Sequence, residues 1–136
     1  MKKIYLMGIL LMGFIAVYAQ GAVQTTTIKW EQTENNFGTF KEDAGPQSFT
    51  FNFTNTGKVP LVLTDVKASC GCTTPQWSKE PVQPGKSGFV TATYNPSGRP
   101  GSFSKSITVT ANTDPASTVL KISGEVIPMA PPQENK

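Results

Sequence analysis

Polar and apolar side chains alternate along most of the chain after Thr27, and this alternation restricts the fold more than any other feature of the sequence. Between residues 48 and 54, the rings of Phe49, Phe51 and Phe53 are separated by single polar residues. Successive side chains of a β-strand point to opposite faces of a sheet, so these rings would line one face. No run of about a dozen residues shows the 3.6-residue period of an amphipathic helix. The sequence therefore predicts an all-β domain.

Turn-forming residues divide this pattern into short segments. Gly57 provides the backbone freedom for a sharp reversal after the phenylalanine-rich strand. The run 61–68 is apolar on both faces near its start, which predicts a central strand covered on both sides. About seven short strands in about 100 residues are typical of an immunoglobulin-like, two-sheet antiparallel β-sandwich. The segments that contribute lie near residues 28–30, 37–40, 48–54, 61–68, 73–77, 89–94 and, as a hairpin, 103–110 with 120–126.

The beginning of the chain has the features of a secretory signal peptide. Lys2 and Lys3 precede the apolar run 4–17, which ends in Val17-Tyr18-Ala19. The run is shorter than the roughly 20 apolar residues of a spanning helix. We therefore expect cleavage after Ala19, a periplasmic or secreted protein, and no membrane insertion after cleavage. The expected organisation is a signal peptide at 1–19, a linker at 20–26, the sandwich at 27–127 and a disordered, proline-rich tail at 128–136.

Charge and composition argue against several classes of function. Without Lys2 and Lys3, ten basic residues remain against nine acidic ones, whereas nucleic acids and anionic membranes are bound by clustered Lys and Arg. The chain contains no His, so neither a Ser-His nor a Cys-His nucleophile can be assembled within it. A structural zinc site is also unexpected, because such a site normally takes four Cys and His ligands. We expect a protein that is not an enzyme and holds no cofactor.

The element Ser69-Cys70-Gly71-Cys72-Thr73 and several short turn motifs resemble those of a bacterial family of domains of unknown function, number 1573, whose members look like the immunoglobulin-type ASH and Hydin modules. The element with the two cysteines is the most specific of them. The resemblance covers about three quarters of the chain and implies binding to another protein, here an exported or envelope protein. The remaining matches are Asn36-Phe37-Gly38-Thr39, with Asn36 where an acidic residue is expected, Phe51-Asn52-Phe53-Thr54-Asn55-Thr56-Gly57, Pro60-Leu61-Val62, Thr74-Pro75, Pro84-Gly85 and Gly101-Ser102-Phe103-Ser104-Lys105.

The pair Cys70 and Cys72 is the one chemically distinctive feature. In a straight strand their Cα atoms would lie about 7 Å apart, whereas a disulfide prefers about 5.5–6 Å. A bond therefore requires the backbone to curl, which Gly71 is expected to permit, and its three-residue loop predicts a small stabilisation. The favoured interpretation is a structural corner, either bonded or as buried thiols. A redox-active or partner-linking thiol pair and capture of a soft metal such as Cu(I) by both thiolates are the alternatives.

Four further side chains bear on function. Lys67 and Lys79 would lower a thiol pKa if they folded close to the cysteines. Trp77 and Tyr94 would suit a carbohydrate or peptide platform, but a sandwich of this size needs large rings in its core, and core packing is the favoured fate. The leading functional hypothesis is an exported, non-catalytic interaction module. Thiol redox or Cu(I) handling through Cys70 and Cys72 is the second.

Overall fold

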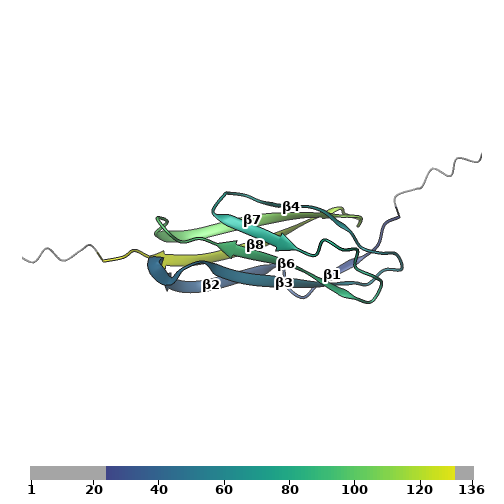
Figure 1. The fold of residues 1–136 in the computed structure, drawn as a ribbon, viewed down its shortest axis with the longest axis horizontal. Coiled ribbons are helices and arrows are strands. Elements are labelled where there is room, and N and C mark those ends of the chain that lie inside the picture. The colour runs from purple at the N-terminus through teal and green to yellow at the C-terminus, as the bar shows by residue number, and fades with distance from the viewer. Residues whose placement is uncertain (1–23, 131–136) are drawn as a thin grey trace, which may run out of the picture.

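The computed structural model describes residues 24–130, which form two packed four-stranded sheets (Figure 1). This confirms the predicted all-β, two-sheet sandwich. One sheet has the strand order β1-β3-β6-β5 and the other β2-β8-β7-β4. The signal peptide, residues 20–23 of the linker and residues 131–136 of the tail lie outside the described residues. The elements are β1 (Ile28–Trp30), β2 (Glu34–Lys41), the 3-10 helix η1 (Glu42–Ala44), β3 (Gln47–Asn55), β4 (Leu63–Ala68), β5 (Thr73–Trp77), β6 (Ser87–Tyr94), β7 (Gly101–Ala111) and β8 (Ser117–Ile127).

The strand order is that of a constant-type immunoglobulin domain with one strand added. Strands β1, β3, β6 and β5 take the A, B, E and D positions, and β4, β7 and β8 take the C, F and G positions. The added strand is β2, which follows β1 without reversing and joins the other sheet beside β8. The described residues therefore contain eight strands instead of about seven. Because β2 pairs with β8 in parallel, the second sheet is mixed and not wholly antiparallel.

The predicted position of strand β4 was wrong. It lies at the edge of its sheet, next to β7 alone, where Leu63 and Val66 are buried and Asp65 and Lys67 are exposed. The apolar start of this segment has another cause. Leu61 precedes the strand, is fully buried, and forms an isolated bridge with Val82 that closes one end of the core.

The core lies between the inward faces of the two sheets. Phe51 and Phe53 are completely buried, as their alternation predicted. Tyr94 is 2% exposed and stacks on Phe103 with 3.8 Å between ring centroids. Trp77 packs half-buried against the same cluster. Both rings thus belong to the core and not to a surface platform.

The polar side chains of the same strands form an outward-facing ladder. Ser48 and Thr93 share a hydrogen bond of 2.8 Å across β3 and β6, and Thr50 and Thr91 share another of 2.8 Å. Cross-strand hydroxyl pairs of this kind stabilise sheets modestly. Asn52 lies on this face and is exposed. No helix among residues 24–130 has the length and hydrophobicity needed to span a bilayer.

A buried amide holds the end of the sandwich at which β3 finishes. The Asn55 side chain is fully buried. Its Oδ1 accepts hydrogen bonds from Thr26 Oγ1 at 2.8 Å and from Gly57 N at 3.0 Å. Its Nδ2 donates to the carbonyls of Val59 at 2.8 Å and Val82 at 2.9 Å. Two accepted and two donated bonds use the whole hydrogen-bonding capacity of the amide.

Replacing Asn55 should therefore lower the free energy of unfolding far more than replacing Asn52, which lies on the opposite face of β3. Asn55→Ala leaves several buried donors and acceptors unpaired, and we expect a loss of about 3 kcal/mol in the free energy of unfolding. Asn52→Ala removes an exposed side chain and its solvent-exposed, 3.3 Å hydrogen bond to Glu31, and should cost less than about 0.5 kcal/mol. Urea denaturation followed by tryptophan fluorescence measures both. Equal losses for the two variants would contradict this account.

Candidate functional site

The connection between β4 and β5 forms a tight corner, residues 69–73, where the chain passes from the edge of one sheet to the edge of the other. Cys70 and Cys72 are joined by a disulfide, with 5.3 Å between their Cα atoms. Cys72 is 7% exposed and belongs to the core, whereas Cys70 is half-buried and Gly71 is exposed. We call this segment the disulfide corner. Cys72 is its buried part, and Gly71 is its exposed tip.

Hydrogen bonds fix the disulfide corner to both sheets. Ser69 N donates to Ser106 O at 2.8 Å, and Ser106 N donates to Ser69 Oγ at 3.2 Å. Asn95 N donates to Cys72 O at 2.9 Å. Thr73, which is 4% exposed, begins β5. The corner is thus held by β7 on one side and by the end of β6 on the other.

The expectation that Gly71 permits the curl was wrong. Its φ lies outside the left-handed region, and a Cβ added there would meet no atom within 4 Å beyond the two adjoining cysteines. The reversal is instead an ordinary turn, closed by a 3.4 Å hydrogen bond from Thr73 N to Cys70 O. Since no residue of this turn has a positive φ, the backbone geometry does not require glycine.

Neither lysine considered from the sequence is placed to act on the sulfurs. Lys67 is exposed on the outer face of β4, and Lys79 Nζ lies over the Trp77 ring, 2.9 Å from its centroid. The sequence analysis missed Lys105. It pairs with the buried Ile122, which places it on the core side of β7, and the Ser69–Ser106 contact puts it beside Cys70 in register.

Lys105 was detectable in the sequence. It lies two residues after Phe103 and two before Ile107, both of which are buried, so it occupies an inward position in an alternating strand. Its half-buried side chain can cover apolar surface with its methylenes while the ammonium reaches solvent. The β4–β7 register, continued past Ala68 opposite Ile107, places this lysine next to the start of the disulfide corner.

A soft-metal site would need a different state of the cysteines. Both are engaged in the disulfide, and a thiolate is the form that binds metal. Among residues 24–130, no three His, Cys, Asp or Glu side chains gather into a group that could hold a metal ion. Capture of Cu(I) by Cys70 and Cys72 would therefore have to follow reduction of their bond.

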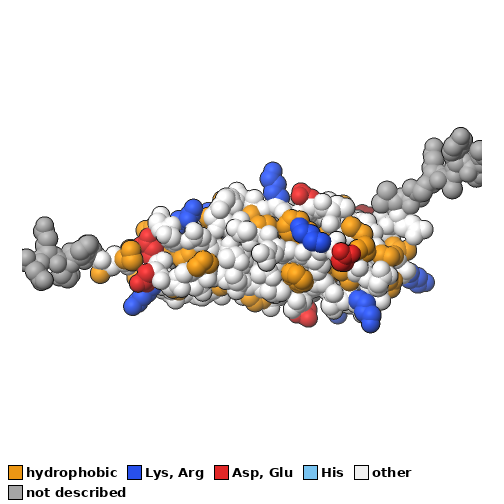
Figure 2. Space-filling view, in the orientation of Figure 1, with side chains coloured by type: hydrophobic (Ala, Val, Ile, Leu, Met, Phe, Trp, Pro, Cys, Tyr) orange, Lys and Arg blue, Asp and Glu red, His pale blue; other side chains and the backbone are white. Residues whose placement is uncertain are grey.

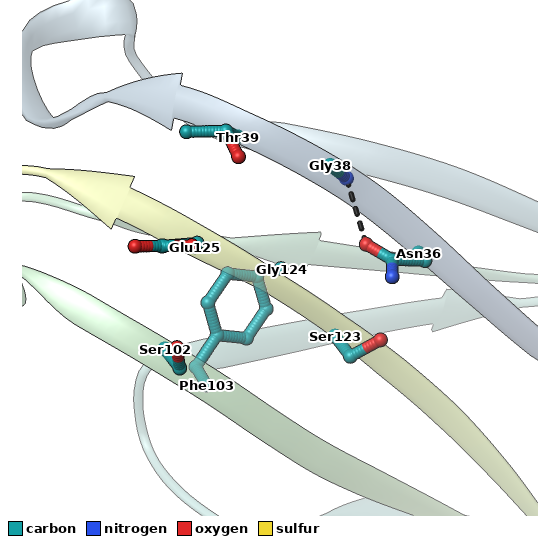
Figure 3. Close-up of a pocket in the computed structure, with 8 residues that line it drawn as sticks. All are labelled: Asn36, Gly38, Thr39, Ser102, Phe103, Ser123, Gly124 and Glu125. Atoms are coloured by element: carbon teal, nitrogen blue, oxygen red, sulfur yellow. Dashed lines mark hydrogen bonds between the residues drawn. The ribbon is translucent and has the colours of Figure 1, made fainter.

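A second feature is a groove on the outer face of the β2-β8-β7-β4 sheet, where β2 bulges away from β8 (Figure 3). The pairing of these strands shifts register between Asn36 and Thr39. Gly38 has a φ of 70°, a value that favours glycine, and its N–H donates to Asn36 Oδ1 at 2.8 Å. The motif Asn36-Phe37-Gly38-Thr39 thus encodes a bulge.

The bulge leaves a groove of about 270 Å³ between β2, β8 and β7. Gly124 lies at its floor: a Cβ there would come within 2.9 Å of the Phe103 ring and 3.0 Å of the Gly38 carbonyl oxygen. The absence of a side chain at Gly124 lets the Phe103 ring and the bulged backbone of β2 pack closely against β8 at this point. The other lining residues are Asn36, Thr39, Ser102, Ser123 and Glu125.

The visible surface carries no large patch of one charge. Figure 2 shows Lys and Arg side chains interspersed with Asp and Glu, and hydrophobic atoms in separate small areas. In the described residues one ion pair is formed, between Lys121 and Glu34 at 3.9 Å. Both partners are largely exposed, so the pair contributes little to stability.

Substitution of glycine by alanine should cost little stability at the exposed tip of the corner and much more in a crowded turn. Gly71→Ala should change the free energy of unfolding by less than about 0.5 kcal/mol. Gly57→Ala places a Cβ against Thr26 Oγ1 and 2.8 Å from Thr27 N, and should cost about 2 kcal/mol or more. Thermal or urea denaturation of the two variants tests this. A marked loss for Gly71→Ala would show that the turn does need glycine.

Removing the disulfide should leave the fold intact. A three-residue loop restricts the unfolded chain little, so Cys70→Ser with Cys72→Ser should lower the free energy of unfolding by about 1.5 kcal/mol. The wild-type protein in reductant should show a similar loss. Both are measured by denaturation with circular dichroism, and loss of cooperative unfolding would contradict the prediction.

Comparisons with known proteins agree on the fold. A protein of unknown function from Porphyromonas gingivalis W83 is 20% identical over 81% of this chain, with a TM-score of 0.67, and this chain spans 51% of its length. The secreted serine protease VesC and the VesB protease, both of Vibrio cholerae, are 12% and 15% identical over 78% and 74% of this chain, with TM-scores of 0.57 and 0.56. This chain spans 24% and 31% of those two chains. At such identities the likeness concerns the fold alone.

No curated protein matches this sequence. The family model described as protein of unknown function (DUF1573) matches residues 28–126, which include the β2 bulge, the disulfide corner and every strand of the sandwich except the last residue of β8. The predicted resemblance is therefore confirmed, and the chain belongs to the DUF1573 family.

Proposed function

We propose that this protein is an exported, non-catalytic interaction module that binds another protein of the cell envelope through the disulfide corner. Export rests on the signal-like sequence of residues 1–19, with Lys2 and Lys3 before an apolar run. The observation that carries the binding proposal is the construction of the corner. An exposed Gly71 stands between a half-buried Cys70 and a buried Cys72.

This construction suits recognition because the binding segment is already ordered. A loop that becomes fixed only on binding loses conformational entropy at that moment, which weakens the complex. Here the bond between Cys70 and Cys72 and the hydrogen bonds to Ser106 and Asn95 fix the tip beforehand. The open space around Gly71 leaves room for a partner to approach its backbone.

The neighbouring strand edges favour the corner over strand addition as the contact. Strand β4 displays Asp65 and Lys67 and has an irregular register near Leu63. Strand β5 has five residues and contains Pro75, which has no N–H to donate. Short, charged or proline-containing edges discourage pairing with another strand. A partner would therefore contact the tip of the corner.

Site-specific photo-crosslinking tests the proposal. A photoreactive amino acid at position 71, where a Cβ meets nothing within 4 Å beyond the two adjoining cysteines, should yield one discrete adduct in cells. The same group at Thr108, an exposed position on the outer face of β7, should yield none and is the matched control. The partner is then identified by mass spectrometry.

The role of the disulfide is tested in the same experiment. With Cys70→Ser and Cys72→Ser, the adduct from position 71 should weaken several-fold because the tip is no longer fixed before binding. No adduct at position 71, or the same adducts from positions 71 and 108, would overturn the proposal. An adduct formed through a cysteine sulfur and cleaved by reductant would instead support the partner-linking thiol alternative.

A further inference from the structure

We infer that the groove beside the β2 bulge binds the positively charged end of a lysine or arginine side chain. The inference deepens the proposed function by naming the chemistry of a protein partner, at a site separate from the disulfide corner. It rests on three features of the groove: an uncompensated carboxylate, a surrounding set of oxygen acceptors and an aromatic floor. Figure 3 shows all three around the same opening.

The carboxylate belongs to Glu125 on the outer face of β8. Among the described residues it forms no ion pair, since the single pair joins Lys121 to Glu34. Lys41 lies two rungs further along β2, opposite Ile127. It lines a different hollow, together with Asp43, Pro128 and Met129. Glu125 is therefore free to accept a cation from outside the chain.

The residues around Glu125 can complete the coordination of a cation. Thr39 on β2 and Ser102 on β7 are its partners in register on either side. Ser123 lies two residues before it, on the same face of β8. Hydroxyl oxygens accept hydrogen bonds from ammonium and guanidinium groups. Thr39 and Ser102 thus offer acceptors on either side of one negative charge, which favours a group with several N–H donors.

The floor is suited to the apolar part of such a side chain. The Phe103 ring is reached past Gly124, at which any Cβ would lie within 2.9 Å of the ring. Lysine and arginine carry methylene stems that pack on apolar surface while their charged ends remain hydrogen-bonded to polar groups. A groove of about 270 Å³ has room for the end of one such side chain.

Asn36 sets the strength of the site. Its Oδ1 is engaged by the Gly38 N–H at 2.8 Å, so its Nδ2 is the atom left to face a ligand, and an N–H donor does not bind a cation. Asn36→Asp would keep an oxygen for Gly38 and place a second negative charge at the groove. The geometry therefore predicts a gain of binding from this single change.

Small cations provide a direct test with the complete mature chain. Methylguanidinium and n-butylammonium are titrated into isotope-labelled protein, with methylurea and n-butanol as uncharged controls. We expect saturable shifts of the amide signals of Thr39, Ser123 and Glu125 with the cations alone. Glu125→Gln should weaken binding about fivefold, and Asn36→Asp should strengthen it about threefold or more.

Matched controls make each outcome decisive. Glu31→Gln removes another exposed carboxylate, on the β1 side of the other sheet, and should leave the titration unchanged. Thermal denaturation checks that every variant is folded. Equal shifts with charged and uncharged probes, or titrations unaffected by Glu125→Gln, would overturn the inference. Because crosslinking from position 71 does not depend on Glu125, failure at the groove and failure at the corner can be told apart.

Discussion

The arrangement of the whole sandwich depends on one buried amide. Asn55 ends a central strand, and its side chain bonds to the segment before β1, to the turn that follows β3 and to the loop that contains Val82. Three parts of the chain that share no regular pairing are thereby joined within a fully buried environment. A polar group in such a place destabilises a fold unless every donor and acceptor is satisfied. The satisfied network therefore selects one arrangement of these segments.

The sequence predicted which side chains face inward better than it predicted which strands are neighbours. Alternation identified Phe51 and Phe53 as core residues, and the short strand Thr73–Trp77 was predicted with its actual bounds. Alternation, however, reports only the two faces of a strand. It could not show that β4 lies at an edge or that β2 runs parallel to β8. Those properties depend on pairings between residues far apart in the chain.

The two candidate sites differ in the same way, because one is formed by residues close in sequence and the other by residues far apart in the chain. The cysteine pair was visible because its residues are close in sequence, but the role assigned to Gly71 assumed a curl that an ordinary turn achieves without a positive φ. The groove was not visible, since its walls come from β2, β7 and β8 and meet only after folding. Asn36 stood out as a departure from the family pattern, yet its meaning emerged only with the bulge that joins it to Gly38.

The parallel pairing of β2 with β8 has a mechanical consequence. Figure 1 shows the chain entering the sandwich at one end of its long axis and leaving β8 at the other. Tension along the backbone would pull these two adjacent strands in opposite directions along their length. Their rungs, from Glu34 opposite Lys121 to Lys41 opposite Ile127, would then be sheared together and could not open one after another. Such a ladder resists stretching more strongly than a hairpin that peels from one end.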